Sequence, residues 1–281
     1  MPNFEYNGLL FYYTEAGQGM PFIFQHGLGG NVDQIIKIYS PPPGVRLITF
    51  DFRGHGKTPI GMKDKLNFKT FADDILALMD HLLLNQAIIG GISMGAAVAL
   101  NFTIRYPARV LGLILSRPAW LDGPMERQNK EIFKLIARLI LEHGPEKGRQ
   151  LFMASDLYMQ LLKVSPNTAQ SFLAHFNYEK ALETAVKFER LPKDAPSEDR
   201  NEWKRITVPT LILANKSDPV HPFEYGSEYA STIVQADFKE ITPKSISEEQ
   251  HNKDVQKNID LFITNLLKRD HATFLNSDHA P

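Results

Sequence analysis

The sequence predicts an α/β fold: a mainly parallel, doubly wound sheet with helices on both faces and an inserted, all-helical block. Two observations support this. Up to about residue 116, short apolar runs typical of buried strands alternate with longer stretches of helical periodicity. From residue 120 to 202 only helical periodicity is evident, after which the strand pattern resumes. We therefore expect a core of residues 1–119 and 203–281, with a cap or lid at 120–202.

Composition narrows the classes of function. A chain of 281 residues can bury a sizeable core, and its 31 basic and 32 acidic residues give a formal net charge of −1. Such a balance offers no general attraction to nucleic acid or to an anionic membrane. The sequence contains no cysteine, which excludes a disulfide framework, a thiol nucleophile and a thiolate metal site. Without a leader pattern or a long apolar run, we expect a soluble, cytoplasmic protein with a small-molecule partner, and its oligomeric state stays open.

The first elements form the scaffold of the sheet. Residues 4–15 predict two strands joined by Asn7 and Gly8, and residues 21–25 predict a buried strand that enters a glycine-rich loop, His26–Gly30. Neither a Gly-Lys-Ser/Thr sequence nor a Gly-x-Gly-x-x-Gly pattern fits this loop, so nucleotide binding is disfavoured. A further strand at 45–50 leads into Asp51–Lys57, whose charged residues we interpret as satisfying the backbone of a tight turn.

A strand, sharp turn and helix around Ser93 carry the clearest chemical signal. Residues 87–92 suit a buried strand, the small residues after Gly95 suit a closely packed helix, and Ser93 lies between Gly91 and Gly95. A serine can be lifted clear of the sheet only on a strained turn, where side chains two residues away on either side would collide. The alternative is a glycine-rich turn that merely lets the helix pack on the strand.

The second half of the chain contains the inserted helices and the return to the sheet. A helix at 125–143 is expected to end at Gly144, and a strandless block of this size between two strands predicts a lid over the carboxyl edge of the sheet. The alternative is a set of ordinary sheet-covering helices. Strands follow at 208–214 and 238–241, then a last helix to about Lys268, with a frayed polar tail at 269–281. Candidate residues for an apolar substrate pocket, each equally able to pack within the lid, are Trp120, Phe152, Met153, Phe172 and Phe176.

Ser93, Asp218 and His251 occur in the order nucleophile, acid and base, each just beyond a predicted strand. With these residues the chain resembles the α/β-hydrolase family over nearly its whole length. The matching segments are His26–Gly30 for the oxyanion loop, Asp51–Gly56 for a structural turn, Gly91–Gly95 for the nucleophile elbow and Asn215–Val220 for the acid.

The resemblance implies a mechanism. Ser93 would attack an acyl carbon, His251 would take its proton, and Asp218 would hold the imidazole in the right tautomer. The backbone N–H groups of Leu28 and Met94 would form the oxyanion hole, and no metal or organic cofactor is implied. One departure from the family is that His251 leads almost directly into the final helix, so the alternative is an exposed histidine near a helix start.

Serine at the elbow separates this chain from haloalkane dehalogenases and epoxide hydrolases, which resemble this fold but carry aspartate there. What remains is a serine hydrolase of a small carboxylic ester, lactone or thioester. Two alternatives stay open: a carbon–carbon bond hydrolase or cofactor-free perhydrolase, and a ligand receptor or regulatory partner with slow turnover.

Overall fold

The computed structural model describes the backbone of residues 2–277 and the side chains of residues 2–268. Within them, one sheet has the strand order β1-β2-β4-β3-β5-β6-β7-β8. β1 pairs antiparallel with β2, and β2 with β4, whereas the remaining neighbours are parallel. The strands are β1 (Asn3–Tyr6), β2 (Leu9–Gly17), β3 (Gly19–Gln25), β4 (Gly44–Phe50), β5 (Ala87–Ile92), β6 (Val110–Ser116), β7 (Thr210–Ala214) and β8 (Ala236–Glu240). The predicted fold class is confirmed.

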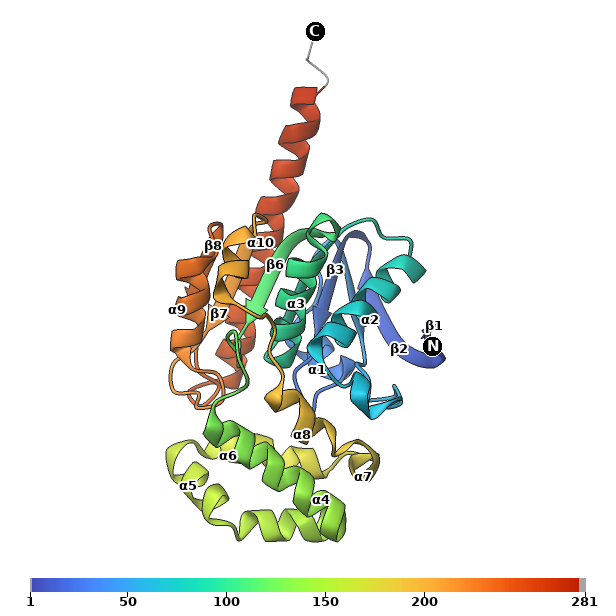
Figure 1. Ribbon diagram of the computed structural model, residues 1–281. Coiled ribbons are helices and arrows are strands. Elements are labelled where there is room, and N and C mark those ends of the chain that lie inside the picture. The colour runs from blue at the N-terminus through green and yellow to red at the C-terminus, as the bar shows by residue number, and fades with distance from the viewer. Residues whose placement is uncertain (1, 278–281) are drawn as a thin grey trace.

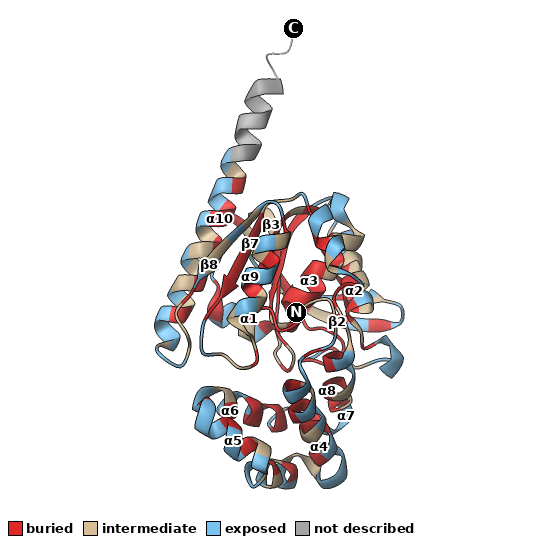
Figure 2. Cartoon of the chain, turned by 60° about the vertical axis from the view of Figure 1, so that its left-hand side comes forward, coloured by how far each residue is buried: buried red, intermediate tan, exposed pale blue. Residues whose placement is uncertain are grey.

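Helices cover both faces of the sheet (Figure 1). Buried residues of α1 (Val32–Ile38) and α10 (Glu248–Ser277) pack in one apolar cluster with β3 and β4. Those of α2 (Phe68–His81), α3 (Met94–Arg105) and α9 (Phe223–Thr232) belong to a second, larger cluster. The central strands, β3 to β7, are largely buried (Figure 2), which explains why they appear in the sequence as continuous apolar runs.

The first turn of the chain agrees with its prediction from the sequence, whereas the last helix differs in length. The opening turn is formed by Asn7 and Gly8 at φ 50° and 71°, the left-handed pair that a two-residue hairpin requires. The last helix, by contrast, continues to Ser277 and does not stop at Lys268. No proline or glycine interrupts the sequence between these positions, and polarity alone does not end a helix. The predicted end of the helix is therefore wrong, the fraying of the tail stays a prediction, and residues 278–281 lie outside the described part.

Between β6 and β7 the described chain has no strand. Its helices gather together beyond the end of β6, away from the sheet (Figure 1). They are α4 (Arg127–Met153), α5 (Asp156–Val164), α6 (Pro166–Leu173), α7 (Ala181–Thr184) and α8 (Lys187–Arg190), with 3₁₀ turns at Ala174–Phe176, Leu191–Lys193 and Arg200–Arg205. Gly144 breaks α4 with φ 75° and ψ 166°, as predicted for this position. We refer to residues 117–209 as the helical insertion, and its status as a separate domain stays a prediction.

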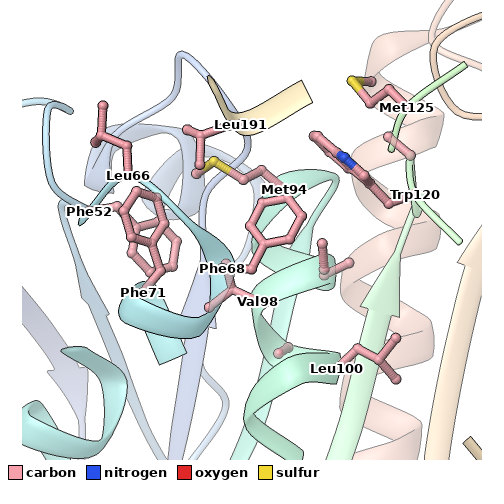
Figure 3. Packing of buried hydrophobic residues seen from close by; sticks show 14 of the residues in the cluster. Phe52, Leu66, Phe68, Phe71, Met94, Val98, Leu100, Trp120, Met125 and Leu191 are labelled. Atoms are coloured by element: carbon pink, nitrogen blue, oxygen red, sulfur yellow. The ribbon is translucent and has the colours of Figure 1, made fainter. Parts of the chain in front are cut away.

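The insertion shares its hydrophobic core with the sheet-covering helices. Trp120, Met125 and Leu191 pack beside Phe68 and Met94 (Figure 3). The rings of Phe68 and Trp120 meet edge to face at 5.1 Å. Both ends of the insertion are thus anchored next to the start of α3, which is the helix that follows Ser93. No helix in residues 2–277 is long and apolar enough to cross a membrane.

Candidate active site

Ser93 occupies a strained turn between β5 and α3. Its backbone has φ 56° and ψ −112°, and its N–H donates to Ser116 O at 2.9 Å. A Cβ on Gly91 would overlap the carbonyl group of Gly95, and a Cβ on Gly95 would overlap the carbonyl oxygen of Gln25. The two glycines therefore meet the steric requirement that the sequence predicts for a serine raised from the sheet edge.

The loop after β3 is held close to Ser93 by a buried imidazole. Phe52 N–H donates to His26 Nε2 at 3.2 Å, so the other ring nitrogen, Nδ1, donates to Gly27 O at 2.9 Å. Burial lowers the pKa of His26 to about 4, which keeps the ring neutral in this role. A Cβ on Gly27 would lie 3.4 Å from Ser93 Cβ. The loop therefore passes directly over the serine.

Two backbone N–H groups at this point are free to bind a ligand oxygen. Met94 is the first residue of α3, where an N–H has no partner within the helix. Neither Met94 N–H nor Leu28 N–H donates to another of the residues that the structure describes. Leu28 lines the cavity above Ser93. Their assignment as an oxyanion hole stays a prediction.

The charged turn after β4 is structural. Asp51 accepts from Val32 N at 2.8 Å and from Lys57 N at 2.7 Å, and a Cβ on Gly56 would overlap its carboxylate. Arg53 forms a bidentate, buried ion pair with Asp74, at 2.7 Å for each contact. These contacts agree with the interpretation of this segment from its sequence.

Asp218 is paired with a histidine only three residues away. His221 Nδ1 lies 2.9 Å from Asp218 Oδ2, and Oδ1 of the same carboxylate accepts from Val220 N at 3.1 Å. Arg117 Nη1 lies 3.4 Å from Oδ2. Burial pushes the pKa of Asp218 upward, but the charge and hydrogen bond of His221, together with Arg117, outweigh it and hold the pKa well below its usual range. The carboxylate is therefore ionised.

In the sequence, His221 follows the acid by only three residues, a spacing that disfavours it as the base. The intervening turn removes that objection. His221 N–H donates to Asp218 O at 3.2 Å, so residues 218–221 fold back and bring the imidazole against the carboxylate. The sequence signal was Pro219, which presets the second position of such a turn.

His251 has different partners. It lies in the first turn of α10, the residue is 1% exposed, and its Nδ1 is 2.8 Å from the carbonyl oxygen of Thr242. Burial, reinforced by the charge of Arg117, lowers its pKa to about 4. In the described part of the chain no hydrogen bond joins His251 to Asp218 or Ser93. His251 is therefore not the exposed histidine of the alternative interpretation. It also does not form the hydrogen bonds to Asp218 and Ser93 that a triad base would form.

Ser93, Asp218 and His221 line one cavity of about 300 Å³ between the sheet edge and the helical insertion. Of the proposed pocket residues, Trp120 and Phe172 also line it. The other three predicted pocket residues, Phe152, Met153 and Phe176, do not line the cavity, so the prediction is wrong for them. Phe152 packs on Phe176 at 5.5 Å between ring centroids, inside the insertion, and Met153 is 40% exposed. Helical periodicity indicates that a side chain is buried, but not which neighbour buries it.

Comparison with known proteins agrees with this architecture. A model of the α/β hydrolase fold family matches residues 20–252. The AB hydrolase superfamily protein YisY of Bacillus subtilis is 29% identical over 243 residues, covering 80% of this chain and 84% of that protein. The 3-oxoadipate enol-lactonase 2 of Acinetobacter baylyi is 27% identical over 242 residues, covering 84% and 86%.

A further curated relative and a solved structure extend the comparison. A 2-hydroxy-6-oxononadienedioate/2-hydroxy-6-oxononatrienedioate hydrolase of Comamonas testosteroni is 33% identical over 232 residues, covering 79% of this chain and 80% of that one. The crystal structure of the enol-lactonase from Burkholderia xenovorans LB400 superposes with a TM-score of 0.67 at 20% identity, covering 94% of this chain and all of that one. This last likeness concerns the fold.

Proposed function

Because the chain belongs to the α/β hydrolase fold family, we propose that it is a serine hydrolase of small carboxylic esters, lactones or thioesters, with Ser93 as nucleophile. The observation that carries the proposal is the strained backbone of Ser93, enforced by Gly91 and Gly95, at the wall of a small cavity. Backbone strain of this kind persists where the surrounding structure over-determines it and is concentrated at active sites.

The base in this proposal is His221, with Asp218 as the residue that orients it. A triad needs a carboxylate on imidazole Nδ1, which leaves Nε2 for the serine proton. The 2.9 Å contact between Asp218 Oδ2 and His221 Nδ1 has this form, and both His221 and Ser93 line the cavity. His251 stays the competing assignment from the sequence, but its Nδ1 is engaged by Thr242.

The reaction would proceed through an acyl-enzyme. Ser93 Oγ attacks the acyl carbon while His221 Nε2 takes its proton, and the N–H groups of Leu28 and Met94 stabilise the oxyanion. His221 then returns the proton to the leaving alcohol or thiol, and water releases the acid by the same steps. Each oxyanion donor would contribute about 3 kcal/mol to the transition state.

The nucleophile assignment is tested by Ser93→Ala. Because removing a triad member leaves only binding and the oxyanion hole, hydrolysis of p-nitrophenyl esters should fall by roughly 10³-fold or more. A fluorophosphonate probe should label the wild-type protein at Ser93 and leave the variant unlabelled. A variant with more than about a tenth of the wild-type kcat would exclude Ser93 as nucleophile.

The base is identified by a matched pair, His221→Gln and His251→Gln, each made alone and combined with Ser93→Ala. Replacing the true base alone should slow hydrolysis nearly as much as Ser93→Ala does, and because residues that act as one unit are not additive, the double variant should be little slower than either single variant. We expect this for His221→Gln, together with loss of the acidic limb of kcat/KM against pH, along which the rate rises as the base loses its proton. If the limb instead lies near pH 4 and disappears with His251→Gln, the lowered pKa of His251 identifies it as the base.

The helical insertion is proposed as the lid that sets substrate size. Support comes from its cavity-lining residues, among them Trp120 and Phe172, and from the hydrogen bond of Asn167 Nδ2 to Lys244 O at 3.1 Å, which joins α6 to the loop before α10. An esterase or lactonase agrees with the enol-lactonase among the relatives. A carbon–carbon bond hydrolase is the second candidate, because a relative at 33% identity carries a name of that kind. Parallel assays of esters, lactones, thioesters and a dienoate substrate separate the two.

A further inference from the structure

The cavity at Ser93 contains more positive charge than its carboxylates balance. Among the described residues that line it, Arg117 and Lys244 are cationic and Asp218 alone is anionic. Asp218 is already shared between Arg117 and the ring of His221. The other histidine of the wall, His175, is kept neutral because burial lowers its pKa to about 3.

Arg117 is fixed at this position at a conformational cost. Its backbone adopts φ 47° directly after β6, held by its N–H, which donates to Leu213 O at 2.7 Å. A left-handed conformation is uncommon in a residue other than glycine and marks a constrained site. The side chain is only 11% exposed, and its contact with Asp218 is long at 3.4 Å. Its Nε is buried and has no hydrogen-bond partner among the residues that the structure describes. The protein therefore buries a guanidinium that it only partly neutralises.

Lys244 approaches the same cavity from the loop before α10. Its nearest carboxylate, Glu248, is 3.6 Å away and 73% exposed, so solvent weakens that pair. Burial, and after it the charge of Arg117, lowers the pKa of Lys244. The two cations are thus close enough to repel each other. Because Arg117 is 11% exposed and Lys244 31% exposed, solvent screens this repulsion only in part, and the arrangement is unfavourable unless an anion lies between or beside the two cations.

We propose that this cavity binds substrates that carry a carboxylate besides the bond to be cleaved, with Arg117 and Lys244 forming the cationic side of the site. The inference rests on the proposed function, since it names the substrate class of the same site. A carboxylate would complete the charge balance around Arg117 and Asp218, and a charge-assisted hydrogen bond in a partly buried site is stronger than a neutral one. The volume of about 300 Å³ limits the substrate to a short chain.

Binding to the Ser93→Ala protein tests the proposal without turnover. The probes are monomethyl glutarate, an ester with a free carboxylate, and dimethyl glutarate, its neutral counterpart, both measured by titration calorimetry at pH 7. We expect the anionic ester to bind at least about tenfold tighter, and the preference to shrink as salt is raised from about 0.05 to 0.5 M. Equal affinity for the two esters would overturn the proposal.

Matched lysine variants locate the effect. Lys244→Met, in the same Ser93→Ala background, should reduce the preference to less than about threefold. Lys216→Met removes the same charge from a surface lysine that pairs with Glu240 outside the cavity, and it should leave the preference unchanged. Arg117→Gln should reduce the preference for the anionic ester as Lys244→Met does. If Arg117→Gln fails to fold, the comparison of Lys244→Met with Lys216→Met still tests the proposal. Equal losses in Lys244→Met and Lys216→Met would exclude a local site. If the wild-type protein hydrolyses no ester but still binds the anionic ester more tightly than the neutral one, the proposed hydrolase activity is wrong and the proposed carboxylate-binding site is supported.

Discussion

At the scale of single residues, the elbow depends on two glycines that are constrained by space. Gly91 and Gly95 have no positive φ, yet any Cβ there would overlap backbone atoms of Gly95 or Gln25. Backbone cannot move aside as a flexible side chain can. The site is therefore built by close contact among β3, β5 and α3, and a methyl group would disturb both packing and the position of Ser93.

We predict that Gly95→Ala lowers the free energy of unfolding by about 1–3 kcal/mol, the usual cost of overpacking, and reduces labelling of Ser93 by a fluorophosphonate. Urea unfolding at constant m-value measures the first effect. Gly123→Ala is the control, because a Cβ there meets nothing within 4 Å. Equal stability of the two variants would contradict the packing argument.

The residue scale also marks the limit of prediction from sequence. Ser93 and Asp218 could be singled out because local patterns place them beyond strands, and the steric role of the flanking glycines follows from their spacing. The partner of Asp218 does not follow from the strand ends alone. His221 reaches the carboxylate through a local reverse turn, for which Pro219 is the sequence signal, whereas the contact of His251 with Thr242 depends on how the chain enters α10.

At the scale of elements, α6 is one part of the insertion that lines the cavity. Asn167, Thr168, Ser171 and Phe172 of α6 line it, whereas Phe152 and Met153 at the end of α4 do not. The break at Gly144 explains the difference, because it redirects the second half of α4 away from the first, in which Phe133 lines the cavity. The sequence predicts this break but not the direction in which the chain leaves it.

We therefore predict that Phe172→Ala and Met153→Ala differ. Phe172→Ala enlarges the cavity, so kcat/KM for longer p-nitrophenyl acyl esters should rise relative to the acetate by about tenfold, the scale of one or two methylene groups in an apolar pocket. Met153→Ala, at an exposed position, should keep the wild-type ratio. Identical chain-length profiles for wild type and Phe172→Ala would show that α6 does not set substrate size.

At the scale of the whole molecule, the layered architecture follows from the alternation of strands and helices, because each βα unit buries an apolar strand under an amphipathic helix. The sequence does not reveal that a lysine of the insertion is buried against the core. Lys187 of α8 is 2% exposed, and its Nζ donates to Gly54 O at 2.7 Å, on the core side. It faces the rings of Tyr178 and Phe188 at 5.1 and 5.2 Å.

Three histidines, His26, His55 and His175, also surround Lys187, and burial keeps their pKa values below neutrality. Asp51 is the acid that favours the charged amine, but burial dominates and lowers the pKa of Lys187 from 10.5 to about 7. The ammonium is consequently a charge that the folded protein holds less readily than the unfolded chain does, and folding stability must depend on pH through it.

Between pH 7 and 10.5 the unfolded chain binds more protons at this lysine than the folded protein does, so stability should rise with pH. From pH 7 to 9, below the range where tyrosines ionise, the gain at one site is limited to about 1.4 kcal/mol per pH unit. We predict that urea unfolding of Lys187→Met loses most of this rise, since the variant has no proton to release. Lys216→Met, an exposed lysine with 62% of its side chain accessible, should retain the wild-type slope. Parallel pH profiles for wild type and Lys187→Met would mean that the buried amine is stabilised as an ammonium, and that Asp51 and the aromatic rings compensate for its desolvation.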